Sequence, residues 1–337
     1  ATMGLSAKTC IKNTVEKFEE MLEINFKTEQ IPMAQGDHPE LDDSDFCTPL
    51  QHSHFRALVG SANWCITLGR FDIAFATQSL VHFSMAPRVG HLTRMMRVFG
   101  CMKTHPNGSI IIDPSLPDHD KCKSPEGMNW QEFCPDAKPE EWQGMPKLLG
   151  KSVKITCCVD ADHAHDQLTC RSVTGIILFI NNTPIRWISK RQKTVETSTY
   201  GSELVAARMA VDLIIEMTHS LRSLGVPIDG PALLLGDNQS VVLNTTVPSS
   251  VLKKKHNPVA CHQICEAIAC GIARFVHIPS SENCTDLMTK SLDKGTFQHL
   301  TCQVLFRQPA AACAPERAIP LIQVQEMSEF QDARPSN

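Results

Sequence analysis

Hydrophobic and polar positions follow two different patterns in the two halves of the chain. Up to about residue 113 the apolar positions recur every three to four residues, which predicts helices. From residue 151 onward short apolar runs alternate with helical stretches, as in a mixed α/β sheet. The expected elements are helices 8–30 and 55–102 (the latter interrupted at Pro87 and Gly90), strands 109–113, 153–160, 173–180, 184–188, 232–237 and 273–278, and helices 197–223, 238–245, 257–271 and 282–292.

The same change of pattern predicts how the chain is divided. Residues 1–113 are expected to form a mostly helical segment, and residues 114–150, which are rich in proline, a linker. Residues 151–295 are expected to form an α/β domain with a five-stranded sheet. Residues 296–337 show little periodicity and predict a disordered tail.

Composition narrows the class of protein. A formal net charge of −4 over 337 residues argues against nucleic-acid binding through general phosphate attraction alone, although local contacts stay possible. No apolar run is long enough to predict a transmembrane helix, and the N-terminus lacks the pattern of a secretory signal. The chain does not begin with Met, which hints at a piece of a longer product. The 15 cysteines are scattered, which favours a reducing, intracellular compartment.

Four residues near the C-terminal end have the side chains of a zinc site: Cys261, His262, Cys265 and Cys270. The two cysteines at 261 and 265 are one helical turn apart, and isoleucines recur at every fourth position from 264 to 272. Small buried cysteines in an amphipathic helix explain this pattern more simply than a metal does.

Four acidic residues lie at the ends of expected strands or near the starts of expected helices. Asp160 and Asp237 each end an apolar strand, where side chains converge on ligands in open α/β sheets. Glu203 heads an apolar helical stripe, where a carboxylate is costly unless a cation pairs with it. Asp286 lies in the first turn of a helix. Each acid alone is explained by a turn or by a favourable charge in a first helical turn, but the ordered set of four is not. Clustered carboxylates suit a hard divalent cation.

Six short motifs follow one another along the second half of the chain: Val159-Asp160-Ala161-Asp162, Arg171-Ser172-Val173-Thr174-Gly175, Pro184-Ile185-Arg186-Trp187-Ile188-Ser189-Lys190-Arg191-Gln192, Ser202-Glu203-Leu204-Val205-Ala206-Ala207, Asp237-Asn238-Gln239-Ser240 and Asp286-Leu287-Met288-Thr289-Lys290. They come in the order found in copia-type retrotransposon polyproteins, and they resemble the ribonuclease H domain of that family. Residues 55–61 and 69–74 resemble the segment that joins the polymerase to that domain, so the resemblance spans residues 8 to 292.

The resemblance implies a fold and an activity. The fold is a ribonuclease H-like mixed five-stranded sheet flanked by helices, preceded by a mostly helical polymerase-connection segment. Asp160, Glu203, Asp237 and Asp286 are implied to be the catalytic, metal-binding residues. They would hold two Mg²⁺ ions (or Mn²⁺) about 4 Å apart and cleave the RNA strand of RNA/DNA hybrids. Asp160 would bridge both ions.

The resemblance also implies a setting. The partners are an RNA/DNA hybrid and the remainder of the polyprotein, in a cytoplasmic virus-like particle or the nucleus, without a membrane. Phe71 replaces a proline common in the family, an apparently neutral change. The polymerase signature of two aspartates on a strand-turn is absent, since Asp42-Asp43 lies in an acidic loop. Residues 1–113 are therefore expected to be a reverse transcriptase remnant without polymerase activity.

Basic and polar residues near the acids are candidates for contacts with nucleic acid, although a solvated surface explains them equally well. The candidates are Lys190, Arg191, Lys193, Asn238, Gln239, Lys254 and Lys255, with Lys253 in the same run as the last two. His277, His256 and His262 are candidates for a histidine that assists product release.

Two alternatives to a nuclease stay open. The first is a catalytically silent relic or a host-adopted nucleic-acid-binding module, which the four intact acids oppose. The second is a transposase or integrase with the same sheet, which would lack a catalytic Glu on the first long helix. Glu203 therefore discriminates against it.

Overall fold

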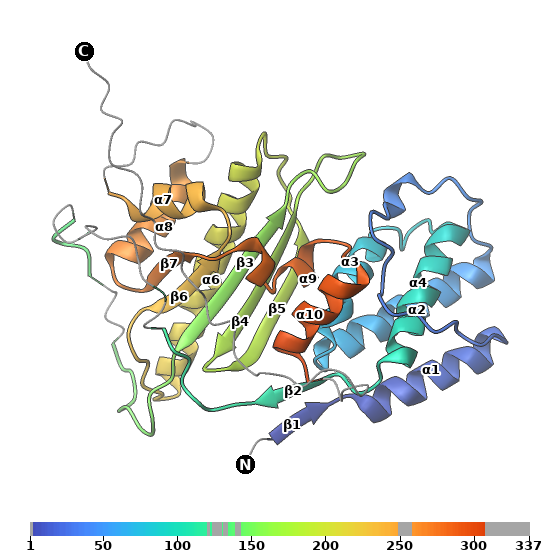
Figure 1. The fold of residues 1–337 in the computed structure, drawn as a ribbon, viewed down its shortest axis with the longest axis horizontal. Helices are drawn as coiled ribbons and strands as arrows, with labels where there is room; N and C mark the ends of the chain where they lie inside the picture. Colours follow the sequence, from blue (N-terminus) through green and yellow to red (C-terminus); the bar gives the residue numbers. More distant parts are fainter. Residues whose placement is uncertain are drawn as a thin grey trace.

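A five-stranded sheet lies in the middle of the molecule, with helices on both of its faces (Figure 1). The computed structural model describes residues 3–119, 122, 130, 134–138, 143–248 and 258–306. The strands are β3 (Ile155–Asp162), β4 (Val173–Ile180), β5 (Thr183–Arg191), β6 (Ala232–Gly236) and β7 (Ala273–His277). Their order is β5-β4-β3-β6-β7.

The sheet is mixed, as the sequence predicts. β3, β4 and β5 pair antiparallel, whereas β3, β6 and β7 run parallel to one another. The connections to β6 and β7 include helices, as parallel pairing requires. The expected fold class, a mixed five-stranded sheet with flanking helices behind a helical N-terminal part, is confirmed.

Two hydrophobic cores lie on the two faces of the sheet. Successive side chains of a strand point to opposite faces, so Cys157 enters one core and Cys158 the other. The core around Cys157 is closed by α6 (Thr199–Ser223), α7 (Gln239–Thr246) and α8 (Pro258–Ala269). Because both faces are buried, strands such as β3 read as continuous apolar runs and not as alternating ones.

The core around Cys158 is closed by the helical N-terminal part together with α9 (Asp286–Thr289) and α10 (Lys294–Val304). The N-terminal elements are β1 (Met3–Ser6), α1 (Lys8–Leu22), α2 (Pro49–Thr67), α3 (Ala74–Val81), α4 (Val89–Thr104) and β2 (Ser109–Ile112), with short 3-10 helices at Pro39–Leu41 and Phe71–Ile73. α1 is shorter than the helix expected over residues 8–30, because Glu23 adopts a left-handed conformation with φ 53° and ends it.

Phe71 joins the helical part to the sheet. Its ring is fully buried and stacks on Trp187 of β5, with the ring centroids 4.8 Å apart. A substitution that looked neutral in the sequence therefore supplies an aromatic contact between the two parts. The hydrophobic core is continuous through this contact. The boundaries proposed at residues 113 and 150 stay predictions.

The structure corrects two expectations near the C-terminal end. Residues 296–304 are not a disordered tail but belong to α10, which Asp293 caps by accepting hydrogen bonds from the backbone N–H groups of Gly295 and Thr296. Phe297, Leu300 and Val304 of this helix are buried in the N-terminal core, which explains its stability. The rest of the expected tail, residues 307–337, lies outside the described residues.

The helix expected over residues 282–292 is also much shorter. A 3-10 turn, Ser280–Glu282, precedes α9, which is only one turn long. Within the described part of the chain, no helix is both long and apolar enough to cross a membrane.

Candidate metal centre

Asp160 is the centre of an acidic group at one end of the sheet. It lies inside β3 and not at its end, because the antiparallel pairing with β4 continues two residues further, to Asp162 opposite Val173. Its side chain is 2% exposed and accepts a hydrogen bond from the hydroxyl of Thr289. A carboxylate this deeply buried requires hydrogen bonds or a cation.

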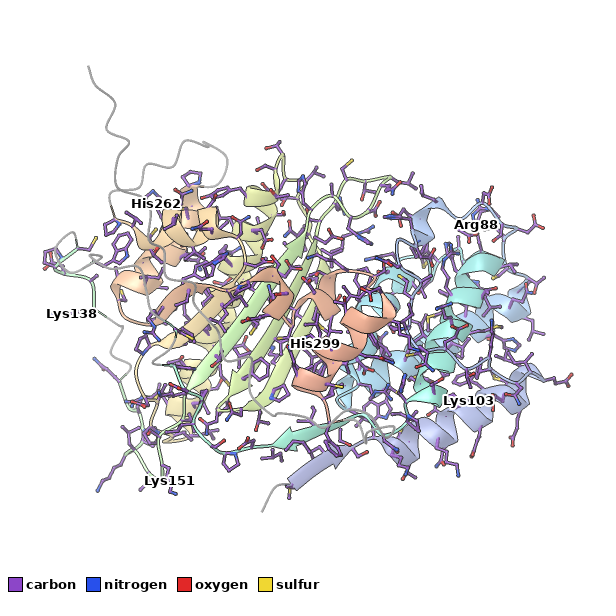
Figure 2. All side chains as sticks on the ribbon, viewed as in Figure 1. Arg88, Lys103, Lys138, Lys151, His262 and His299 are labelled. Atoms are coloured by element: carbon purple, nitrogen blue, oxygen red, sulfur yellow. The ribbon has the colours of Figure 1, made fainter. Side chains whose placement is uncertain are left out.

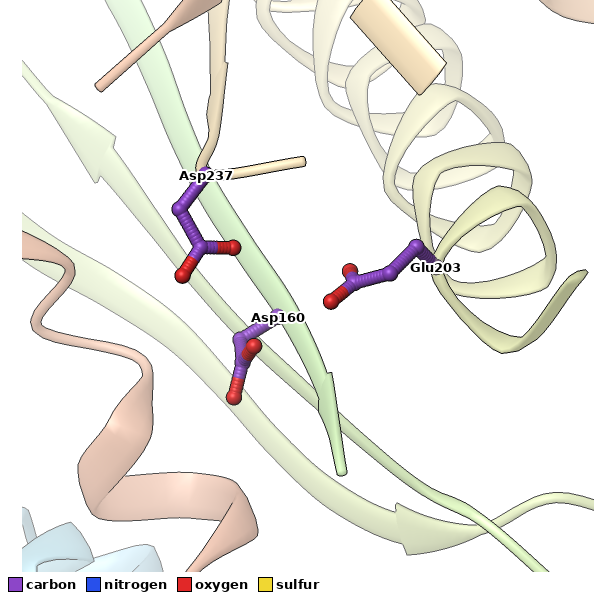
Figure 3. Close-up of side chains that lie close together, drawn as sticks. All are labelled: Asp160, Glu203 and Asp237. Atoms are coloured by element: carbon purple, nitrogen blue, oxygen red, sulfur yellow. The ribbon is translucent and has the colours of Figure 1, made fainter. Parts of the chain in front are cut away.

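Asp237 and Glu203 face Asp160 from two other elements. The parallel register pairs Cys158 with Leu235, so Asp160 and Asp237, each two residues further on, reach the same level of the sheet. Glu203 lies in the second turn of α6, whose start is fixed by the Ser198 side chain accepting from the N–H of Gly201. Ligand oxygens of the three acids lie within 4.8 Å of one another (Figure 3).

Asp286 joins this group through a lysine. It is the first residue of α9, and Lys290, one turn later, places its Nζ 2.8 Å from Asp286 Oδ1 and 3.2 Å from Asp160 Oδ2. The structure therefore brings three predicted acids to a common point and places the fourth beside Asp160 across an ammonium group. The catalytic roles of all four stay predictions.

Gly175 allows α9 to approach the sheet closely. It lies opposite Asp160 on β4. A Cβ atom at this position would lie 2.6 Å from Thr289 Cγ2, 2.8 Å from Met288 Cβ and 2.9 Å from the carbonyl oxygen of Thr285. Only glycine leaves room for α9 here, so the position of Asp286 and Lys290 depends on it.

The clustered acids shift the ionisation of their members. Burial raises the pKa of Glu203 to about 9, and the carboxylates of Asp160 and Asp237 add to this. Burial, followed by the charge of Asp160, raises the pKa of Asp286 to about 7, although Lys290 opposes the shift. Burial acts against the charged form of Lys290, but the carboxylates of Asp160 and Asp286 raise its pKa above the ordinary value. The site as a whole favours a bound cation.

The donor set indicates which cations fit. Asp160, Glu203 and Asp237 offer only carboxylate oxygens, which suit hard cations such as Mg²⁺, Mn²⁺ or Ca²⁺ and not thiolate-preferring metals. In the part of the chain that the structure describes, these acids form the one group with three or more potential metal ligands this close together. Cys261 and Cys265 lie on α8, as expected, and His262 is exposed on it (Figure 2). Of these cysteines Cys261 is buried, whereas Cys265 and Cys270 are half-buried.

The other predicted site residues differ from one another in exposure and in their contacts. Lys190 and Lys193 are exposed, while Arg191 forms an ion pair with Asp166 at 2.6 Å. Asn238 caps α7 by accepting from the N–H of Val241, and Gln239 is exposed. Lys253, Lys254, Lys255 and His256 lie outside the described residues.

His277, one of the two predicted histidines that the structure describes, contacts the strand end that carries Asp237. It ends β7, and its Nε2 is 3.1 Å from the backbone oxygen of Asp237. The contact holds the ring beside the strand end that carries Asp237, and the side chain stays exposed.

Three supporting residues were not singled out from the sequence. Gln192 donates to Thr174 Oγ1 and to the backbone oxygen of Ser202, which ties the start of α6 to β4. Asn283 donates to the backbone oxygen of Val159 at 3.0 Å and holds the loop before α9 against β3. Lys290 is the third. Gln192 and Lys290 belong to the recognised motifs, and the i,i+4 spacing of Asp286 and Lys290 was a usable signal.

Comparisons with known proteins give relatives for most of the chain. No family model matches it. The chain is 23% identical over 252 residues to the "Retrovirus-related Pol polyprotein from transposon RE1" of Arabidopsis thaliana. The match covers 75% of this chain and 15% of the relative. It is also 29% identical over 139 residues to the "Retrovirus-related Pol polyprotein from transposon TNT 1-94" of Nicotiana tabacum. That match covers 41% of this chain and 10% of the relative.

Solved structures similar to part of the chain include LC11-RNase H1, isolated from compost by a metagenomic approach. The two sequences are 17% identical, and the match covers 40% of this chain and 92% of the LC11-RNase H1 chain with a TM-score of 0.31. The same protein in complex with an RNA/DNA hybrid gives 16% identity, 40% and 94% coverage and a TM-score of 0.30. The sequence relatives agree with the resemblance read from the motifs: this chain is similar to a stretch of retrovirus-related Pol polyproteins from transposons, and it spans only about 15% of the length of the RE1 polyprotein.

Proposed function

We propose that this chain is the ribonuclease H part of a retrotransposon polyprotein and cleaves the RNA strand of RNA/DNA hybrids with the help of divalent cations. The observation that carries the proposal is the convergence of Asp160, Glu203 and Asp237 on one point, in a chain related to Pol polyproteins. A core or a solvated surface does not require three carboxylates within 4.8 Å of one another.

The acids divide between two positions for a cation. Asp160, Glu203 and Asp237 would hold one Mg²⁺, and Asp160 with Asp286 would hold a second. When bound, the cations would lower the pKa of an attacking water and offset the charge on the departing 3′ oxygen. Thr289 orients Asp160 by donating to its Oδ2. Glu203, with a pKa raised to about 9, is neutral at pH 7 without a cation, so cation binding is coupled to loss of its proton.

Hybrid recognition would depend on shape and not on base sequence. An RNA/DNA duplex is distinguished by its groove width and by 2′-hydroxyl contacts. Lys190 and Lys193 are exposed on and just after β5 and are proposed to contact backbone phosphates. Arg191 is a weaker candidate, because Asp166 already neutralises it at 2.6 Å.

The helical N-terminal part is proposed to have no polymerase activity. The adjacent aspartates there, Asp42 and Asp43, lie in a loop, and Asp42 is ion-paired with Arg94 and accepts from Ser44. An acid held by these contacts does not offer a free carboxylate to a nucleotide-bound metal. Template-directed incorporation of dNTPs by this chain alone would contradict the proposal.

One assay tests the nuclease directly. The intact chain is incubated with an end-labelled RNA/DNA hybrid and Mg²⁺, with and without EDTA, beside matched RNA/RNA and DNA/DNA duplexes. We expect cleavage of the RNA strand of the hybrid alone, abolished by EDTA. Binding of the hybrid without cleavage at any Mg²⁺ or Mn²⁺ concentration would refute the proposed nuclease activity. It would favour the alternative of a catalytically silent nucleic-acid-binding module.

A further inference from the structure

Lys290 lies where a cation would lie. Its Nζ is 2.8 Å from Asp286 Oδ1 and 3.2 Å from Asp160 Oδ2, which are the two acids that would share the second metal position. Asp286 is also absent from the group of three acids whose ligand atoms lie within 4.8 Å of one another. Of the two proposed metal positions, one is thus bordered by carboxylates alone, and the other contains an ammonium group.

We propose that, in the enzyme without nucleic acid, Lys290 acts as a built-in cation between Asp160 and Asp286. The free chain would then bind one divalent cation, at Asp160, Glu203 and Asp237. The position between Asp160 and Asp286 would accept a cation only when Lys290 has moved away. This inference rests on the proposed nuclease function and deepens it.

The hydrogen bonding of Asp160 supports this division. Its Oδ2 accepts from the Thr289 hydroxyl and lies 3.2 Å from the Lys290 ammonium. A carboxylate oxygen has about two lone-pair sites, so these two donors occupy Oδ2. Oδ1 is left for a cation shared with Glu203 and Asp237. A second cation beside Oδ2 would have to displace the ammonium, since two like charges so close together repel strongly.

The structure also gives Lys290 a way to leave. Its backbone is anchored, because its N–H donates to the carbonyl oxygen of Asp286 at 3.1 Å and α9 is seated against β4 at Gly175. Its side chain, in contrast, is 34% exposed, on a flexible four-carbon stem. A phosphodiester that enters the site offers the ammonium another anion, so arrival of the hybrid would free the second position. Lys290 is therefore a positioning residue that couples nucleic-acid binding to cation binding.

Counting bound Mn²⁺ tests the proposal without any catalytic readout. Mn²⁺ is titrated into the intact, nucleic-acid-free chain, and free Mn²⁺ is followed by electron paramagnetic resonance. We expect one ion per chain for the parent and two for Lys290→Met. The matched control is Lys294→Met, which removes the same charge from an exposed lysine four residues away and should leave one ion. Lys290→Arg keeps the charge and should also leave one.

A double variant tests whether the second ion of Lys290→Met binds at Asp286. Lys290→Met combined with Asp286→Asn removes the lysine and one of its acids together, so the count should return to one ion. Circular dichroism of each variant shows whether it is folded, and Lys290→Gln gives a second, polar replacement if the Met variant is not. One ion for both Lys290→Met and Lys290→Gln, or two ions for the parent, would overturn the proposal.

The same measurements separate this inference from the proposed function. A parent that binds no Mn²⁺ and cleaves no hybrid would refute the nuclease itself. A parent that binds one ion and cleaves the hybrid, with no second ion in the Lys290 variants, would refute the role of Lys290 alone.

Discussion

Two of the charged groups in the part of the chain that the structure describes differ in their balance of charge. In the helical part, Arg70 and Asp72 are both fully buried and form a bidentate pair, with Nε–Oδ1 and Nη2–Oδ2 distances of 2.9 Å. At the end of the sheet lie four carboxylates, those of Asp160, Glu203, Asp237 and Asp286, and the lysine beside them, Lys290, forms ion pairs with Asp160 and Asp286.

The difference separates a structural role from a functional one. In the Arg70–Asp72 pair each charge meets an opposite charge in good geometry, so the charges balance within the pair, although Arg70 Nη1 is buried without a hydrogen-bond partner among the described residues. Burial alone acts against the Arg70 cation, but Asp72 reverses this and raises its pKa. In the acidic group burial and then the neighbouring carboxylates raise the pKa values of Glu203 and Asp286, which disfavours their charged forms, and Lys290 does not offset this. Excess charge of one sign at a buried position indicates a site that is completed by a ligand.

The largest effect is expected when the balanced pair is broken. Asp72→Asn keeps the size of the side chain but leaves the Arg70 cation buried without its counter-ion. Removing one partner of a buried pair is destabilising by about 3–5 kcal/mol. Urea unfolding followed by circular dichroism measures this loss. The Mn²⁺ count at the acidic group should not change in the variant while it stays folded, and a loss below about 0.5 kcal/mol would contradict a structural role for the pair.

The opposite outcome is expected when the unbalanced group loses a charge. Asp237→Asn should lower hybrid cleavage by at least about 100-fold, or about 2.7 kcal/mol of transition-state stabilisation. The free energy of unfolding without a cation should stay the same or rise slightly, because one of several mutually repelling carboxylates is removed. Equal cleavage by the variant and the parent would refute the assigned metal role, and loss of stability would make Asp237 structural.

Packing behind the acidic group gives a smaller effect. In Gly175→Ala the new methyl group would overlap Thr289, Met288 and the backbone of Thr285, so α9 must shift. Overpacking of this kind destabilises a protein by about 1–3 kcal/mol. Since α9 carries Asp286 and Lys290, cleavage should fall further than the loss of folded protein explains.

Gly60→Ala is the matched control for this substitution. Gly60 lies in α2, and a Cβ there would meet nothing within 4 Å. Alanine in the middle of a helix is favoured over glycine by about 0.5–1 kcal/mol, so the control should be slightly stabilised and fully active. A Gly175→Ala variant that is as stable and as active as Gly60→Ala would show that α9 does not depend on the glycine.

The contrast between the two regions also shows how far the sequence could predict the structure. The strands and the four acids follow from short-range patterns, because β-type apolar runs and their flanking acids are local signals. The short α9 and the contact between Asp160 and Lys290 depend on how the chain packs at Gly175, which no local pattern contains. The helix α10 was missed for the same reason: Phe297, Leu300 and Val304 are stabilised by the distant N-terminal core and not by strong local propensity.

The smallest expected effect is the change in the free energy of unfolding with each pH unit, measured in the absence of divalent cations. The folded chain holds a proton on Glu203 up to a pKa of about 9, whereas the ordinary pKa of a glutamate is 4.5. Between these values the folded state binds more protons than the unfolded state, so stability falls as pH rises. Asp286, raised to about 7 from 3.8, acts in the same direction over a lower range. One proton corresponds to a slope of at most about 1.4 kcal/mol per pH unit.

Between pH 7 and 9 a variant is needed to isolate Glu203, because buried cysteines with raised pKa values, such as Cys157 and Cys284, also make stability fall as the pH approaches 9. Desolvation lowers the pKa values of the buried His91 and of His82, which is exposed, so their contribution rises with pH below about 6.5 and opposes that of the acids there. Urea unfolding in EDTA at pH 7, 8 and 9 should show a falling free energy of unfolding, and excess Mg²⁺ should flatten the curve, because a bound cation holds Glu203 ionised. Glu203→Gln should flatten it in EDTA as well, whereas the balanced Arg70–Asp72 pair contributes no slope in this range. Stability in EDTA that is constant or rises from pH 7 to 9 would show that Glu203 is ionised without a cation, and the contrast between the two charged groups would then lose its physical basis.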